Sequence, residues 1–113
     1  MRAEDGVSMK IPTRFKLMGQ TIEVVWKDHL NQERNRKGEA HYWSNEIWLQ
    51  RENDGMSARR EMVDETFCHE LVHWLMFFAG QDYCGKDMTD DEHLVGLLGC
   101  LLHQALVTME YEE

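Results

Sequence analysis

The chain has 113 residues, which is enough for one domain and too few for two separate hydrophobic cores. Hydrophobic residues make up 42% of it, a share typical of proteins that fold around a core. Twelve Lys and Arg against 21 Asp and Glu give a formal net charge of −9, so the protein should repel phosphate backbones and anionic lipid surfaces. Direct binding to nucleic acid or to a membrane is therefore not expected.

The cysteines and the first residues bear on the cellular compartment. Cys68, Cys84 and Cys100 are odd in number and widely spaced, which argues against a disulfide framework and for a reducing environment. Residues 1–10 contain acidic side chains and no apolar run of the kind found in signal peptides, and no stretch of the chain approaches 18 uninterrupted apolar residues. We expect a cytoplasmic protein in which a flexible arm, residues 1–10, precedes a single domain over residues 11–113.

Alternating apolar and polar residues predict short strands in the first half of the chain. The first two runs flank Gly19-Gln20, which suits a two-residue type II′ hairpin turn. That turn would place Leu17 opposite Ile22, with the apolar side chains of both strands on one face. Two further strands are expected over residues 39–43 and 46–50.

The second half of the chain predicts two helices. Ser57 is the expected N-cap of the first, which would run to about Ala79 with Gly80 as the residue after its end. Its second half is apolar on nearly all sides, as in a helix that is buried on most faces. Thr89 or Asp90 should open the second helix. The core-facing stripe expected on that helix comprises Leu94, Val95, Leu98, Leu101, Leu102 and Leu106.

The first of these helices carries the sequence His69-Glu70-Leu71-Val72-His73, which matches the H-E-x-x-H motif. Residues four apart project from one face of a helix, so the two imidazoles could bind one metal ion. Glu70 is rotated by about 100° from His69 and need not be a ligand. A carboxylate in that place could take a proton from a water molecule acidified by zinc and pass it to a leaving amine.

A third ligand must come from farther along the chain. Glu92 lies in the first turn of the second helix, where antiparallel packing would bring it back to the motif. The same residue could instead complete a capping box with Thr89, and His93 is a rival ligand on another face of the helix. Gly96 and Gly99 continue the face of Glu92, and such small residues would allow a close approach to the motif helix.

With the HELVH motif and Glu92 at the start of a final helix, the chain resembles the small phage and prophage zincins, or minigluzincins, related to the ImmA/IrrE metallopeptidases. The resemblance extends over residues 11 to about 107. It implies an α+β, minimal zincin-like fold, in which a small antiparallel-rich sheet packs on the HExxH helix and a C-terminal helix. It also implies zinc bound by His69, His73 and Glu92, with Glu70 as the catalytic acid and base.

These observations support a zinc-dependent metalloendopeptidase that hydrolyses a protein or peptide substrate in the cytoplasm, which is the host cytoplasm if the protein is phage-encoded. An alternative is a zinc-binding interaction module, or a latent protease homologue, that keeps the site without proteolysis. A third possibility is a stable α+β domain that binds no metal. The sequence does not separate these three, because all of them are compatible with the same motif.

Several other residues have less specific interpretations. Tyr83, His93 and Tyr111 are candidates, by residue type only, for stabilising the oxyanion of a peptidase reaction. Cys68 precedes the motif directly and is expected to be a buried small hydrophobe rather than a ligand. His41 could border the substrate cleft, but an ordinary surface position is the preferred expectation.

Overall fold

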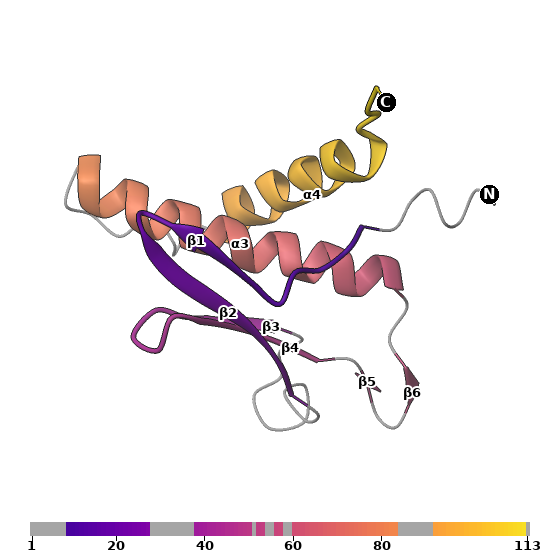
Figure 1. Cartoon of the computed structure of the whole chain (residues 1–113), viewed down its shortest axis with the longest axis horizontal. Coiled ribbons are helices and arrows are strands. Elements are labelled where there is room, and N and C mark those ends of the chain that lie inside the picture. The colour runs from indigo at the N-terminus through magenta and orange to yellow at the C-terminus, as the bar shows by residue number, and fades with distance from the viewer. Residues whose placement is uncertain are drawn as a thin grey trace.

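The structure is a computed structural model that describes residues 9–27, 38–50, 52–53, 56–57, 60–83 and 92–112, with the backbone alone for residues 52–53, 56–57 and 80–83. It is an α+β protein with a four-stranded mixed sheet and two helices (Figure 1). In chain order the elements are β1 (Arg14–Leu17), β2 (Gln20–Lys27), β3 (Gly38–His41), β4 (Glu46–Gln50), β5 (Glu52–Asn53), β6 (Met56–Ser57), α3 (Arg60–Tyr83) and α4 (Glu92–Thr108).

The main sheet joins two local hairpins through a parallel contact. Its strand order is β1-β2-β4-β3, with antiparallel pairs at both sides and β2 parallel to β4 in the middle. The parallel pair places Val24 beside Ile47 on the face that the helices cover. Two of the three pairs are antiparallel, in agreement with the expected antiparallel-rich sheet, while the parallel pairing of the inner strands was not predicted.

The first hairpin turns one residue earlier than predicted. Phe15 lies opposite Ile22 and Leu17 opposite Gln20, so the two turn residues are Met18 and Gly19. Both have positive φ angles, 51° and 77°, as a type I′ turn requires, and this turn matches the twist of the flanking strands. The predicted pairing of Leu17 with Ile22 is therefore wrong. The partners shift by two residues, so the apolar side chains remain on the same face.

Helix α3 lies between the sheet and α4, which accounts for its apolar character on nearly all sides (Figure 1). One core cluster fills the space between α3 and the sheet and consists of Ile22, Ile47, Leu49, Phe67, Cys68 and Trp74. A second cluster, Val72, Met76 and Val95, joins α3 to α4. The motif helix is thus packed from two sides, as the sequence predicted.

The ends of α3 differ from the predicted ones. Ser57 is not the N-cap, because it belongs to β6 and pairs with Glu52 of β5, and the helix begins at Arg60. At the other end the helix continues through Gly80 to Tyr83. A single helical Gly costs only about 1 kcal/mol relative to Ala, so a Gly alone does not end a helix.

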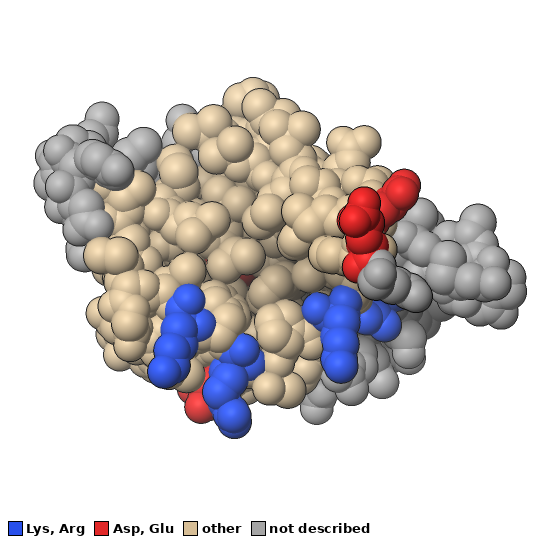
Figure 2. All heavy atoms as spheres, turned by 45° about the horizontal axis from the view of Figure 1, so that its top comes forward, with Lys and Arg blue, Asp and Glu red and all other residues tan. Residues whose placement is uncertain are grey.

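Helix α4 packs through most of the predicted stripe. Leu94, Val95, Leu98, Leu102 and Leu106 belong to or pack against the core clusters, whereas Leu101 is 52% exposed. The buried residues of the helix are Val95, Gly99 and His103. The predicted start at Thr89 or Asp90 lies outside the described residues, and the helix begins at Glu92 within them. Figure 2, turned so that the α4 side comes forward, shows charged side chains at the margins of this face and an uncharged middle.

A buried carboxylate ties the start of the described chain to α3. Asp64 is fully buried and accepts hydrogen bonds from the backbone N–H of Met9 at 3.0 Å and from Nε of Arg60 at 3.1 Å. Arg60 also donates to the carbonyl oxygen of Met9. Met9 falls within the expected N-terminal arm, whose residues 1–8 lie outside the described part of the chain.

We expect Asp64→Ala to lower the free energy of unfolding by about 2–3 kcal/mol, because the part-buried N–H of Met9 and the guanidinium of Arg60 would lose their charged acceptor. Glu61→Ala is a suitable control, since Glu61 is exposed in the same helical turn and should contribute less than about 1 kcal/mol. Urea denaturation of both variants measures the difference. Equal changes in the two variants would show that the Asp64 contacts add nothing to stability.

Among the helices described, none is long and apolar enough to cross a membrane.

Candidate metal centre

His69 and His73 lie on one face of α3, one helical turn apart. Their ring centroids are 5.0 Å apart, so both imidazoles reach the same region in front of the helix. The side chain of His69 is 30% exposed and that of His73 only 11%, which places the pair at the edge of the packed interior. The motif spacing therefore produces the two-histidine arrangement that the sequence predicted.

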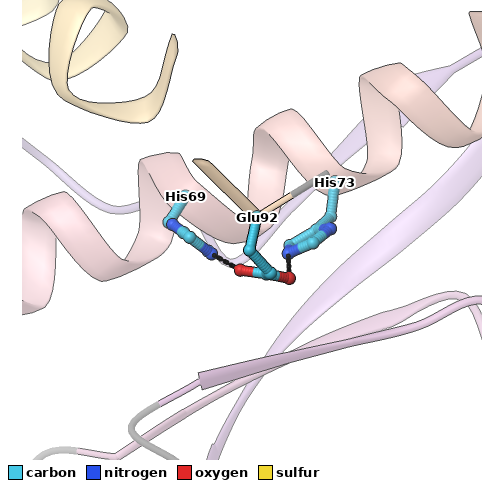
Figure 3. A group of neighbouring side chains, drawn as sticks. All are labelled: His69, His73 and Glu92. Carbon is cyan, nitrogen blue, oxygen red and sulfur yellow. Dashed lines mark hydrogen bonds and ion pairs between the residues drawn. The ribbon is translucent and has the colours of Figure 1, made fainter. Parts of the chain in front are cut away.

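Glu92, the first residue of α4, places its carboxylate between the two imidazoles (Figure 3). Its Oε1 lies 3.1 Å from Nε2 of His69, and its Oε2 lies 2.9 Å from Nε2 of His73. An ionised carboxylate can only accept hydrogen bonds, and each imidazole can donate to it only through a protonated Nε2. Residues 23 positions apart in the sequence thus meet at one point, with each Nε2 atom directed at the carboxylate.

The donor set of these three residues fits zinc. One nitrogen or oxygen atom from each of His69, His73 and Glu92 lies within 4.8 Å of the others, and these residues form the one group of this kind in the described part of the chain. A tetrahedral zinc ion needs donor atoms about 3.3 Å apart, and the donor atoms here lie within 4.8 Å of one another, so modest side-chain shifts would bring them to that spacing. Two histidines with one carboxylate leave a fourth position for water or substrate, as in catalytic rather than structural zinc sites.

The geometry places Glu92, and not His93, beside the two histidines. Glu92 directs both carboxylate oxygens at the histidines, while Thr89, its proposed capping partner, lies outside the described residues. His93 is exposed and is not part of the group that could hold a metal. The position of Glu92 on α4 thus agrees with a ligand role.

Glu70 occupies a different side of α3 from the two histidines. It is 7% exposed, and its Cγ would be 3.2 Å from a Cβ atom added at Gly38, the first residue of β3. Glu70 therefore lies between the helix and strand β3, outside the group of potential metal ligands. This position agrees with the expectation that Glu70 is not a ligand. The space for the Glu70 side chain exists because Gly38 has no side chain.

Of the three candidates for oxyanion stabilisation, the structure describes the side chains of His93 and Tyr111. Tyr111 follows the far end of α4, is 79% exposed and donates from its hydroxyl to Sδ of Met109 at 3.6 Å. The side chain of Tyr83 lies outside the described part of the molecule. His93 is exposed and directly follows Glu92 in α4.

His41 is not a surface residue, contrary to the preferred expectation. It is 7% exposed, its Nε2 lies 2.7 Å from Oε1 of Glu39, and its ring stacks on Trp48 with centroids 3.7 Å apart. The alternation of a strand puts residues 39 and 41 on one face, so the Glu39-x-His41 pattern was a signal for this pair. Trp43 is 86% exposed just beyond the end of β3.

Cys68 is a buried small residue, as predicted. It is fully buried in the core cluster beside α3, with Met9 Sδ 3.7 Å from its sulfur. Burial raises the pKa of the Cys68 thiol from 9.0 to about 11, with a further contribution from the negative charges of Asp64 and Glu65. The thiol is therefore neutral near pH 7 and is not a thiolate ligand.

His103 is buried between the two helices, although the sequence shows no local partner for it. It is 6% exposed, and its Nδ1 is 3.9 Å from Oε2 of Glu65 on α3. It continues the buried stripe of Val95 and Gly99 at intervals of four residues, which was the available signal.

No protein-family model matches the chain, and no curated protein and no solved structure matches it. The functional assignment therefore depends on the chemistry and geometry of the site itself.

Proposed function

We propose that this protein is a zinc-dependent metalloendopeptidase of the small gluzincin type that cleaves a protein substrate in the cytoplasm. The observation that carries the proposal is the carboxylate of Glu92 lying 3.1 Å and 2.9 Å from the Nε2 atoms of His69 and His73. A helix motif alone supplies two histidines. The third, charged donor from a second helix completes the set that a catalytic zinc ion needs.

His69, His73 and Glu92 would hold the ion, which when bound supplies Lewis acidity for the scissile carbonyl and for a water molecule. Glu70 has the role of general base and then general acid, taking the proton of the attacking water and delivering it to the leaving nitrogen. Burial between α3 and β3 restricts the motion of Glu70, which favours a fixed position of its carboxylate for both proton transfers.

Strand β3 supplies a means of orienting the substrate. It is the terminal strand of the described four-stranded sheet, and Gly38 at its start lies against Thr66 and Glu70 of the motif helix. An extended peptide pairing with β3 would run beside the catalytic carboxylate, as in other cases of strand addition. The resemblance to small phage zincins suggests a protein substrate, and the net charge of −9 argues against nucleic acid.

Metal analysis of the purified protein combined with a cleavage assay tests this function. We expect about one zinc ion per chain and hydrolysis of unfolded casein or a peptide library that stops when a chelator removes the metal. Absence of zinc after reconstitution would contradict the proposed metal centre. Stoichiometric zinc without cleavage of any library peptide would instead favour the zinc-binding interaction module.

A further inference from the structure

Of the two glycines in the described part of α4, Gly99 is the one that lies close to the motif helix. A Cβ atom added there would lie 3.0 Å from Cα of His69, 3.3 Å from its N and 3.5 Å from its Cβ. Carbon atoms in normal contact are about 3.5–4.0 Å apart. The three atoms belong to or adjoin the backbone of a regular helix, so no change of side-chain rotamer can relieve the contact.

Gly99 and Glu92 share one face of α4. They are seven residues apart, which is within about 20° of two full turns and corresponds to about 10 Å along the axis. A Cβ atom added at Gly99 would meet the backbone of His69, while Glu92 contacts the imidazole of the same residue. The position of α4 over His69 therefore also fixes how far the Glu92 carboxylate reaches.

Displacing α4 would affect metal binding more than it would affect packing. An Ala at position 99 requires α3 or α4 to shift by a few tenths of an ångström, because the added Cβ would meet helix backbone. Metal–ligand distances in proteins lie within about 0.2 Å of their standard values. Because the helix moves as a unit, a shift of this size at Gly99 would take the carboxylate of Glu92 out of its bonding distance.

We propose that Gly99 is a positioning residue for the third metal ligand, and that the missing side chain at this position sets the zinc affinity of the site. This inference rests on the proposed metal centre, with His69, His73 and Glu92 as ligands. It assigns to α4 a second role besides packing, since the helix holds a ligand in place through one close backbone contact.

Gly96 provides a matched control on the same helix. A Cβ atom added at Gly96 meets nothing within 4 Å, so Gly96→Ala introduces no contact with α3. Both substitutions are the same chemical change in a helix interior, and both improve helix propensity by about 1 kcal/mol. Any difference between them therefore reports the contact at His69.

The experiment measures the zinc affinity of apo-protein by competition with a chelator of known affinity. We expect Gly99→Ala to bind zinc about tenfold or more weakly than wild type, and Gly96→Ala to bind within about twofold of it. In the Glu92→Ala background, Gly99→Ala should cause no further loss, because the ligand that it positions is already absent. Circular dichroism and thermal unfolding of each apo-protein establish that the variants are folded.

Glu92→Asp keeps the test decisive if Gly99→Ala does not fold. Position 92 is exposed at the start of the helix, so this variant should fold, and its carboxylate is withdrawn by one methylene group. Unchanged zinc affinity in Glu92→Asp, or in a folded Gly99→Ala, would overturn the inference while leaving the proposed function in place. A wild-type protein that binds no zinc would overturn both.

Discussion

Glu92→Ala is expected to weaken zinc binding by more than about 100-fold, because it removes a charged atom that would bond directly to the metal. Substitution of residues that only orient a ligand already costs about 10- to 100-fold in metal affinity, so loss of the ligand itself should cost more. If Glu92 were merely a helix cap, the same substitution would lower stability by about 1 kcal/mol and leave affinity unchanged. The ligand interpretation therefore predicts a loss of zinc affinity, whereas the capping interpretation predicts a loss of stability alone.

The matched control is His93→Ala, the neighbouring exposed residue and the rival ligand. Competition titrations with a chelator on both apo-proteins give the affinities, and the rise in melting temperature on adding zinc gives an independent measure of binding. We expect His93→Ala to bind zinc like the wild type. Retained affinity in Glu92→Ala together with its collapse in His93→Ala would transfer the ligand role to His93.

The parts of the structure that the sequence predicts well are those encoded by neighbouring residues. His69 and His73 are placed on one face by helical periodicity alone, and the apolar surroundings of the motif correctly predict a helix packed on two sides. Helix ends are less predictable, because Ser57 and Gly80 carry real end signals that other contacts override. Such a helix-end signal is a local preference, and it sets the end of a helix only where no stronger contact opposes it.

Long-range pairing could not be predicted from the chain itself. The parallel contact between β2 and β4 joins two hairpins that are separate in sequence, and no local pattern specifies which of their strands become neighbours. The approach of Glu92 to the histidines is of the same kind. Sequence periodicity placed Glu92 at the start of a helix, whereas its reach depends on the fit between Gly99 and His69, a contact across 30 residues.

His41 and His103 show that a histidine can be buried where a carboxylate lies close to it. His41 and His103 look polar and isolated in the sequence, yet Glu39 and Glu65 provide carboxylates 2.7 Å and 3.9 Å from them. For His41 the partner is two residues away on the same strand face, so the pair could have been found. For His103 the partner lies on the other helix, and only the packing of α4 on α3 brings them together.

Glu70→Gln should abolish most hydrolysis while leaving the metal bound. Glu70 lies outside the group formed by His69, His73 and Glu92, so replacing it removes no ligand. The amide has nearly the same shape in the narrow space beside Gly38, but it cannot accept a proton from water at neutral pH. We expect the cleavage rate to fall by about 10²-fold or more, the contribution usual for general acid and base catalysis.

The measurement pairs zinc stoichiometry with the rate of peptide cleavage, on wild type and Glu70→Gln prepared side by side. Glu61→Gln is the control, because it makes the same change at an exposed position two turns and more away on the same helix and should keep both properties. Loss of zinc from Glu70→Gln would make Glu70 a ligand. Full activity in Glu70→Gln would mean that the observed hydrolysis does not use this carboxylate, and the peptidase mechanism proposed for the site would be wrong.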